Sequence, residues 1–490
     1  MRKKSADARV RPGPLLLSSA AAALVALAGL ADDASAAVSV TAGPHGQYST
    51  IQAAINQVVA NGGGDVLVEV KFCHSPMGYD YVCPYVENLL VQTTTELNLR
   101  GGWHSDFVTQ YSDGTLSQIK GTGSVAPVML LVAANGTIRV TNFDIDGTAV
   151  SGNSKTVGIA ANSGTNSLIV ILGNRIHDHS LLTTAGTGFA GGAGIHAVAN
   201  GAGAKVTIDA NELFDNVVYG TDNSASYGGA VSLDTLAGGQ AFFDLNDVHA
   251  NSVSNVNNGA CHGGGLWARA NTGFIQLDGN HYTGNMQFAC SNGATGDAAE
   301  ISAANGAEVD VKNERWTSNA VANDPGVYEV FMHAETDAAI YAGNGLVTHG
   351  TWGGLYAQSD APNAHIILSN FTIADNPVLG FHGVGTGTQL WNTIMWNDGT
   401  PYQLDGGASF AYYLFGSNPL FVDAANGNYR LSKGSPAINA GANAPPGGAY
   451  ATDLDGVARP YISDGFALTD IGAYEFHDDT LFKNGFEQQL

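Results

Sequence analysis

The sequence predicts an all-β protein, a solenoid in which short parallel strands wind into a parallel β-helix, with one short capping helix near the N-terminus. Two patterns support this fold class. Short segments, such as those in AKVTIDAN and GFIQLDGN, alternate apolar and polar positions and end at Gly, Asn or Asp, which is typical of strands. An asparagine also recurs, at intervals that shrink from 37 to 22 residues, at positions Asn174, Asn211, Asn246, Asn280, Asn313, Asn344, Asn370 and Asn392.

The shortest interval defines the repeat unit. Twenty-two residues at roughly 3.3 Å per residue suffice for three short strands and three turns, which is one circuit of a coil. We expect successive circuits to stack about 4.8 Å apart, with each strand pairing in parallel with its equivalent in the next circuit. The longer intervals then add loops to this unit.

The recurring asparagine is assigned to the fold. Asn tolerates the left-handed backbone region that tight turns require, and its amide can hydrogen-bond to the Asn of the next circuit. Repeated positions of a solenoid usually serve the repeat itself. A row of sugar or metal ligands is the alternative interpretation.

Composition and charge exclude several partners. The 64 glycines and the 13% of charged residues suit a tightly wound coil, and we expect one elongated domain because no stretch has the composition of a disordered linker. The net charge of −24 would repel nucleic acids and anionic membranes, and it disfavours a polyanionic ligand unless calcium bridges the charges. We therefore expect no nucleic-acid partner, a monomer, and no cofactor, with calcium as the one alternative.

Residues 1–36 have the pattern of a signal peptide. A basic start, RKK at 2–4, precedes an apolar stretch over 15–30, and ASA at 34–36 fits a cleavage site. Cleavage would remove five basic and three acidic residues and leave a net charge of −26. No later apolar run reaches transmembrane length, so we expect a protein that is secreted or located at the cell surface.

Four cysteines in an exported chain favour disulfides over a metal site. Cys73 and Cys83 flank a short loop, which suits a local bridge. Cys261 and Cys290 are predicted just before equivalent strands of consecutive circuits, and one circuit's rise of about 4.8 Å is within the Cα separation that a disulfide accepts. A zinc site is disfavoured because no Cys-x-x-Cys pair is present.

The capping helix is predicted within YSTIQAAINQVVANGGG at 48–64. Its apolar face consists of Ile51, Ala54, Ile55, Val58 and Val59. Ser49 and Gln52 have the spacing of a capping box, and the glycines at 62–64 would end the helix. Such a helix would plug the first circuit.

This helix, the DVLVEV that follows it and the asparagine-marked circuits resemble the right-handed parallel β-helix repeat proteins of the pectin-lyase-like superfamily. The resemblance implies a right-handed coil over residues 37–415, and it specifies a fold better than an activity.

Three later motifs, NPLFVDAANGNYRLSKGSPAINAGA, DLDGVARP and TDIGAYEF, resemble the C-terminal region of exported β-helix proteins of the choice-of-anchor type, which implies a capping region over 416–476. LFKNGFE is similar to a short terminal signature of secreted proteins, which implies a sorting tag in the tail at 477–490. Asp453, Asp455 and Asp464 have a spacing faintly like that of a calcium loop, but its glycine and final glutamate are missing, so a structural cap is preferred.

Alignment of the strands on inward aliphatic residues defines two outward columns of side chains. The inward set is Ile195, Val231, Leu266, Ile301, Val330 and Leu355. The next position gives His196, Ser232, Trp267, Ser302, Phe331 and Tyr356, continued by His382. Two residues further on lie Val198, Asp234, Arg269, Ala304, His333 and Gln358. The candidate ligand-binding residues are His196, Asp234, Trp267, Arg269, Phe331, His333, Tyr356, Gln358 and His382.

A row of exposed aromatic residues edged by polar groups is what a groove for an extended polysaccharide needs, since ring faces stack on sugars and polar groups bind hydroxyls. We therefore predict that the protein binds carbohydrate or another cell-surface partner along this face. If long loops cover the aromatic column, a purely structural surface protein is the alternative.

A polysaccharide lyase or glycoside hydrolase is a further alternative. A hydrolase needs two carboxyl groups about 5 to 9.5 Å apart, and the predicted columns contain only Asp234. The motif series of β-helix polygalacturonases is absent from the sequence. Arg269 beside Asp234 is the one pair near the description of a lyase site, and it is more simply a cross-strand ion pair. No catalytic residues are assigned, and an enzyme is not the preferred interpretation.

Overall fold

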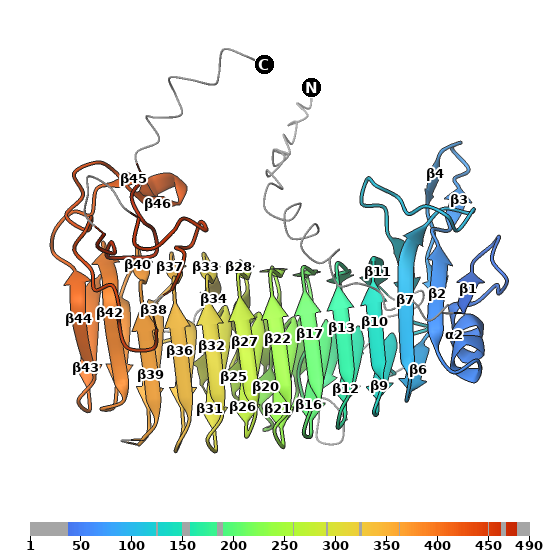
Figure 1. Ribbon diagram of the computed structural model, residues 1–490, viewed down its shortest axis with the longest axis horizontal. Coiled ribbons are helices and arrows are strands. Elements are labelled where there is room, and N and C mark those ends of the chain that lie inside the picture. The colour runs from blue at the N-terminus through green and yellow to red at the C-terminus, as the bar shows by residue number, and fades with distance from the viewer. Residues whose placement is uncertain are drawn as a thin grey trace, which may run out of the picture. The chain divides into compact units, whose positions relative to one another are not determined.

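The computed structural model describes residues 38–477 with the exception of 124–125, 149–156, 184–189, 258, 291–292, 323–325, 362, 449 and 462–466. The predicted signal peptide and the terminal signature lie outside the described residues. The described chain forms a parallel β-helix, which confirms the predicted fold class (Figure 1). A right-handed sense is the general rule for parallel crossover connections.

One face of the coil is an eleven-stranded parallel sheet, called the site sheet below. It consists of β6 (Leu89–Thr93), β9 (Met129–Ala133), β12 (Ile159–Ser163), β16 (Ile195–Asn200), β21 (Val231–Leu236), β26 (Leu266–Asn271), β31 (Ala299–Ala304), β35 (Tyr328–Ala334), β38 (Gly353–Ser359), β41 (Leu379–Val384) and β43 (Thr400–Asp405).

The largest sheet supplies two further strips. The long strip consists of β1 (Ser39–Ala42), β2 (Gly64–Glu69), β7 (Glu96–Trp103), β10 (Thr137–Thr141), β13 (Leu168–Leu172), β17 (Lys205–Asp209), β22 (Gln240–Asp244), β27 (Phe274–Asp278), β32 (Glu308–Lys312), β36 (Ala339–Gly343), β39 (His365–Ser369), β42 (Thr388–Trp396) and β44 (Ser409–Leu414). The short strip consists of β5 (Tyr85–Val86), β8 (Ser117–Lys120), β11 (Phe143–Asp146), β14 (Arg175–His177), β18 (Glu212–Phe214), β23 (Asp247–His249), β28 (His281–Thr283), β33 (Arg315–Thr317), β37 (Leu346–Thr348) and β40 (Thr372–Ala374).

The middle circuits contain more than the three strands expected. A fourth strip consists of β15 (Ser180–Thr183), β19 (Val217–Gly220), β24 (Ser252–Asn255), β29 (Met286–Phe288) and β34 (Ala320–Ala322). It is followed by the two-residue strands β20 (Ser226–Tyr227), β25 (Cys261–His262) and β30 (Ala294–Thr295). These additions account for the longer asparagine intervals.

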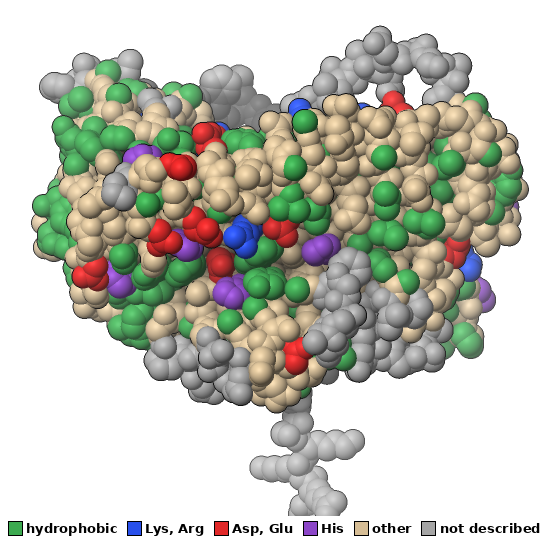
Figure 2. Space-filling view, turned by 90° about the horizontal axis from the view of Figure 1, so that it is seen from below, with side chains coloured by type: hydrophobic (Ala, Val, Ile, Leu, Met, Phe, Trp, Pro, Cys, Tyr) green, Lys and Arg blue, Asp and Glu red, His purple; other side chains and the backbone are tan. Residues whose placement is uncertain are grey.

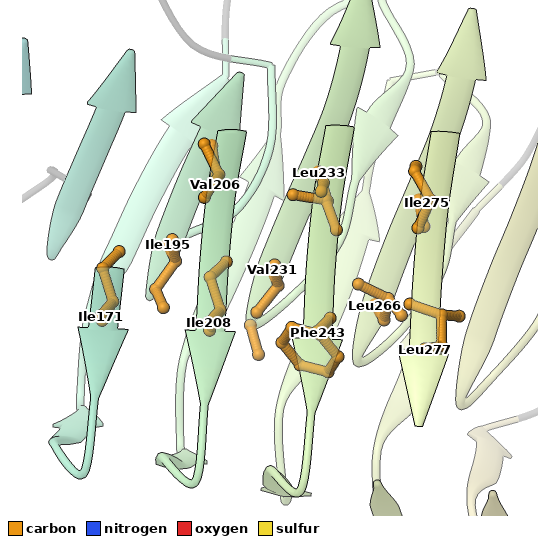
Figure 3. Packing of buried hydrophobic residues seen from close by; sticks show 14 of the residues in the cluster. Ile171, Ile195, Val206, Ile208, Val231, Leu233, Phe243, Leu266, Ile275 and Leu277 are labelled. Atoms are coloured by element: carbon orange, nitrogen blue, oxygen red, sulfur yellow. The ribbon is translucent and has the colours of Figure 1, made fainter. Parts of the chain in front are cut away.

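The core lies inside the coil, between the site sheet and the long strip. The fully buried residues of three consecutive circuits include Ile195, Val231 and Leu266 on one side and Ile208, Phe243 and Leu277 on the other (Figure 3). Alternate residues of each strand point inward, as the sequence pattern predicts, and the stacked aliphatic side chains make one continuous hydrophobic cluster.

Backbone pairing corrects the predicted register at one circuit. Leu266 pairs with the residue two positions before Ile301. The first outward column therefore contains Glu300 in place of Ser302, and the second contains Ser302 in place of Ala304. A slip of two residues keeps every side chain on its predicted side of the strand, so the alternation could not reveal it.

Helix α2 (Ile51–Ala60) packs against the first strands of the coil, as predicted. Its buried residues are Ile51, Ala54, Ile55 and Val58. Val59, predicted on the same face, is 38% exposed. The N-cap is Thr50, whose hydroxyl accepts a hydrogen bond from the backbone N–H of Ala53 at 3.3 Å, so the predicted cap at Ser49 was wrong by one residue.

The recurring asparagines occupy two adjacent positions of the circuit. The first four, Asn174, Asn211, Asn246 and Asn280, are buried and form a ladder. The backbone N–H and Nδ2 of Asn246 both donate to Oδ1 of Asn280, at 2.9 and 3.0 Å, and Asn280 donates in the same way to Glu314. The other four, Asn313, Asn344, Asn370 and Asn392, lie one position earlier, with φ between 49° and 60°. Both predicted roles occur together in this second set, since Asn344 Nδ2 donates to Oδ1 of Asn313 at 3.1 Å and Asn392 Nδ2 donates to Oδ1 of Asn370 at 2.9 Å. The buried first set forms a ladder without the left-handed turn.

A second ladder was not predicted. It consists of Asn216, Asn251, Asn285 and Asn319, all buried, and each donates to the next. Glu329 ends it and accepts from the backbone N–H and Nδ2 of Asn319 at 2.9 and 2.7 Å. Both ladders therefore end at a buried glutamate.

Both predicted disulfides are confirmed. Cys73 and Cys83 staple a hairpin of β3 (Phe72–His74) and β4 (Asp80–Val82), with their Cα atoms 5.6 Å apart. The Cα atoms of Cys261 and Cys290 are 5.7 Å apart. Cys261 pairs in register with Ala294, so Cys290 lies in the turn before β30 and not at an equivalent strand position.

The described residues of 416–476 pack along the flank of the last circuits, where Figure 1 shows β45 (Phe421–Asp423) and β46 (Asn428–Leu431) above β40. Arg315 Nη2 donates to the Leu454 carbonyl at 2.9 Å, and Asn344 Nδ2 donates to the Thr452 carbonyl at 2.7 Å. These described contacts of the region lie on the flank of the coil. No helix of the described residues is long and apolar enough to cross a membrane.

The carboxylate of Asp453 accepts backbone N–H groups of Asp455, Val457 and Glu475 at 2.8 to 2.9 Å. Because these donors occupy both oxygens, Asp453 serves as a structural cap of the surrounding turns. Asp464, the third acid of the faint calcium pattern, lies outside the described residues.

Candidate functional site

The nine candidate residues all lie on the outward face of the site sheet. Strand pairing runs through one column in the order His196, Ser232, Trp267, Glu300, Phe331, Tyr356 and His382. The neighbouring column contains Asp234, Arg269, Ser302, His333 and Gln358. Figure 2 views the molecule from the side on which Figure 1 labels β16, β21, β26 and β31, and it shows acidic, basic, histidine and hydrophobic side chains gathered in a band.

The aromatic residues of the first column pack on one another. The rings of Phe331 and Tyr356 are parallel within 3°, with centroids 4.9 Å apart. Trp267 is 9% exposed and lies against Tyr227, with centroids 4.7 Å apart. Phe331 and Tyr356 therefore turn one ring face towards each other, at the spacing of paired strands. Open ring faces are not found at Trp267, which Tyr227 of β20 covers, or between Phe331 and Tyr356.

A hydrogen-bonded network covers the C-terminal half of the face. The Tyr356 hydroxyl donates to Oε1 of Gln358 at 2.6 Å, and Nε2 of Gln358 donates to Oδ1 of Asp360 at 2.7 Å. Nε2 of His333 lies 2.8 Å from Oδ2 of Asp360. These bonds lower the pKa of Asp360 although partial burial opposes them. The network fixes half-exposed polar groups in defined directions.

Further along the face, His382 lies between two partners. Its Nε2 is 2.9 Å from Oδ2 of Asp405, and its Nδ1 is 3.0 Å from the Tyr328 hydroxyl. Asp405 also accepts from Nε2 of Gln403 at 2.7 Å. The outward column thus continues as a chain of oriented polar groups up to β43.

The centre of the face differs because some of its polar groups have no hydrogen-bond partner among the described residues. Asp234 and Arg269 are cross-strand neighbours on β21 and β26. No described residue hydrogen-bonds to the carboxylate of Asp234, and burial raises its pKa to about 6, with Arg269 offsetting part of the shift. Nε of Arg269 is buried and has no hydrogen-bond partner among the described residues. Such unused polar groups require an explanation in a native structure.

Arg269 does not form the predicted cross-strand ion pair with Asp234. Its Nη2 lies 3.5 Å from Oε1 of Glu335, at the end of β35 and two circuits away. This is a loose contact between groups that are each 39% exposed, and such pairs contribute little to stability. The guanidinium therefore remains accessible to a ligand.

Glu300 is the most important residue that the sequence interpretation missed. It follows Trp267 in the first column, and Nδ1 of His262 lies 2.8 Å from its Oε2. Tyr227 stacks on His262, with centroids 5.0 Å apart. Glu300 is therefore held at the rim of the face by residues of β20 and β25. The prediction that Asp234 is the only acidic residue in the two outward columns was wrong, because Glu300 also lies there.

One group of side chains outside the site sheet has the spacing of a metal site. Among the described residues, one group of His and acidic side chains, Asp146, His177 and Asp178, places its ligand atoms within 4.8 Å of one another. Nε2 and Nδ1 of His177 lie 2.6 and 2.8 Å from Asp144 and Asp178, and these contacts raise its pKa against the effect of burial. Nζ of Lys120 lies 2.9 Å from Asp146. Both imidazole nitrogens thus face carboxylates of the chain and Asp146 is paired with Lys120, so the ligand atoms of this group already have partners.

Comparisons with known proteins add little to this geometry. No protein-family model matches the chain. No curated protein sequence matches it. Among solved structures, the A-module of the mannuronan C-5 epimerase AlgE6 of Azotobacter vinelandii is similar to this chain, with 14% sequence identity, 75% of this chain and 94% of that chain covered, and a TM-score of 0.25. At this TM-score the likeness carries no argument about the site.

Proposed function

We propose that the protein binds an extended polysaccharide, as a glycan or as part of a cell-surface partner, along the outward face of the site sheet. The observation that carries this proposal is the unsaturated pair at its centre. Asp234 offers acceptor oxygens to which no described residue donates, and the 39% exposed side chain of Arg269 offers donors whose nearest carboxylate, Glu335, lies 3.5 Å away, on circuits about 4.8 Å apart. Neighbouring hydroxyl groups of a sugar can donate to the carboxylate and accept from the guanidinium.

The rest of the face also fits a ligand that is an extended polymer. Half-exposed polar side chains continue along it in three consecutive circuits, with His333, Gln358 and His382. Each circuit advances by about 4.8 Å, which is close to the length of one sugar unit in an extended chain. Ring edges of Phe331 and Tyr356 supply apolar contacts between these polar groups.

The proposal is tested by binding measurements on the full chain with a panel of soluble oligosaccharides, by calorimetry. Arg269→Gln and Asp234→Asn should each weaken binding about tenfold without changing the unfolding transition. Arg139→Gln is a matched control, because Arg139 is also 39% exposed and paired with a glutamate, but lies on the long strip. Absence of saturable binding across the panel, or equal losses in the control, would contradict the proposal.

A second candidate function, cleavage of the polysaccharide, is favoured by Glu300. Asp234 and Glu300 lie on the same face, two circuits apart along the axis and two residues apart along the strand, which are offsets of about 9.6 Å and about 6.6 Å. Inverting hydrolases hold their two carboxyl groups about 6.5 to 9.5 Å apart, so the two side chains would have to lean towards each other over the bound polymer. Release of reducing ends or of an ultraviolet-absorbing product, lost in Asp234→Asn, would show this activity. If no product forms from any oligosaccharide that binds, the enzyme interpretation fails. If none binds, a purely structural surface role is the remaining one.

We also propose that the protein acts outside the cytoplasm. Two disulfides support this, because such bonds persist in oxidising compartments. The signal peptide, the sorting tag and the assignment of 416–476 as a choice-of-anchor region belong to the same proposal. Mass spectrometry of protein recovered from the culture medium and cell surface checks it, since cleavage after residue 36 should leave an N-terminus at residue 37.

A further inference from the structure

The candidate face is acidic. Arg269 is the one Lys or Arg residue within the eleven strands of the site sheet. Its charge is opposed by Glu335. The acidic residues on the face or at the strand ends that border it are Asp234, Glu300, Glu335, Asp360 and Asp405.

These acids are spread along the coil axis. They belong to β21, β31, the end of β35, the end of β38 and β43. Six strand spacings separate β21 from β43 in the site sheet, which is about 29 Å at 4.8 Å per circuit. The face therefore presents a line of negative charge in the direction in which an extended polymer would lie.

Imidazole groups hold three of the carboxylates in place. His262 lies 2.8 Å from Glu300, His333 lies 2.8 Å from Asp360, and His382 lies 2.9 Å from Asp405. A neutral imidazole that donates one N–H fixes the direction of a carboxylate without removing its charge. Asp360 and Asp405 remain 40% and 52% exposed, so their charge is presented to solvent.

We propose that the polysaccharide bound by this face carries protonated amines, as polymers of deacetylated amino sugars do. This inference rests on the proposed function and adds the sign of the ligand's charge. A line of carboxylates attracts regularly spaced ammonium groups and repels uronate polymers, whereas a neutral glycan gains no electrostatic attraction. The loosely paired Arg269 then binds a hydroxyl oxygen of the same chain.

The test compares four soluble oligomers of equal length on the full protein by calorimetry at neutral pH: glucosamine, N-acetylglucosamine, glucose and mannuronate. At about 0.01 M salt we expect the glucosamine oligomer to bind about tenfold more tightly than its N-acetylated counterpart, and we expect the difference to disappear at about 1 M salt. The mannuronate arm is run with calcium and with a chelator.

Two variants sharpen the test. Asp360→Asn and Asp405→Asn should each reduce the preference for glucosamine several-fold, since each removes one charge from the line. Asp247→Asn is the control, because Asp247 is 54% exposed and lies on the short strip.

The outcomes separate the two proposals. Mannuronate binding that equals or exceeds glucosamine binding, with calcium or without it, would overturn the inference and leave the proposed function standing. Equal binding of the glucose and glucosamine oligomers at low salt would do the same. If no oligomer binds, both proposals fall.

Discussion

The two asparagine ladders and the outward face of the site sheet are both columns of polar residues stacked about 4.8 Å apart, but they use their hydrogen bonds differently. In the ladders, each buried amide is bonded to the next circuit and to a backbone carbonyl. On the face, the residues change from circuit to circuit, and in the central pair no described residue donates to Asp234, while Nε of Arg269 has no partner among the described residues and its Nη2 makes only the loose contact with Glu335.

This contrast indicates where function can lie in a repeat protein. A repeated polar residue whose hydrogen bonds are all satisfied stabilises the coil, whereas an irregular column with unsatisfied groups has capacity for a ligand. Substitutions in the ladders should therefore change stability, and substitutions at the centre of the face should change binding.

The largest effect is expected from Asn246→Ala. The substitution removes the acceptor of two donors of Asn211 and the donor to the Ile208 carbonyl, all inside the coil. Loss of about 3 kcal/mol or more of unfolding free energy is expected, because buried polar groups are left unpaired. Chemical denaturation followed by circular dichroism measures it. Asn162→Ala, at an exposed position of β12, should change the free energy by less than about 0.5 kcal/mol, and equal effects in the two variants would contradict the ladder's role.

The next prediction concerns the pH dependence of stability at Glu314, the glutamate that ends the first ladder. Burial raises the pKa of Glu314 well above its ordinary value of 4.5. The folded state therefore keeps a proton that the unfolded chain releases, and the stability contributed by Glu314 is complete below pH 4.5 and is lost as the pH rises above it. The slope from one such group is at most about 1.4 kcal/mol per pH unit.

In Glu314→Gln, the side-chain amide oxygen can accept the same two hydrogen bonds from Asn280, and the neutral amide needs no proton for this. We expect the variant to be more stable than the wild type at neutral and alkaline pH, with little difference near pH 4.5. Denaturation at a series of pH values measures this, and Glu308→Gln, at an exposed position of β32, is the control. Parallel pH profiles for the wild type and Glu314→Gln would show that the ladder end does not titrate.

The smallest effect is expected from Phe331→Leu. The ring of Phe331 stacks on Tyr356, so its loss should cost about 0.5–1.5 kcal/mol of stability beyond the change in apolar area. Affinity for an oligosaccharide should change less than about twofold, because the ring face is occupied by its neighbour. Calorimetry of binding and of unfolding gives both numbers. A large loss of affinity with unchanged stability would mean that the ring stacks on the sugar after all.

Much of the fold follows from sequence periodicity. The alternation in each strand separates inward from outward side chains, and it places Asp234, Arg269 and Gln358 on one face as the structure does. The same alternation cannot detect a slip of two residues, so Glu300 was placed outside the column. The alternation also could not predict that Phe331 stacks on Tyr356, because it gives the side of the strand on which a side chain lies but not the orientation of a ring.

The second asparagine ladder also has a signature in the sequence. The segments LFDN, VHAN, YTGN and WTSN each end in an asparagine at the position of this ladder, so the sequence contains a second repeated asparagine. The rim of the face is different. His262 and Tyr227 come from two-residue strands that only the middle circuits contain, and no periodic pattern announces them.

We propose that Asp234 and Arg269 bind one sugar together. A double-mutant cycle with Asp234→Asn and Arg269→Gln measures whether they do, with the binding free energy of the tightest oligosaccharide determined by calorimetry. If both groups contact the same sugar, the coupling free energy should be about 1 kcal/mol or more. Coupling near zero, with each single variant binding as the wild type does, would contradict the claim.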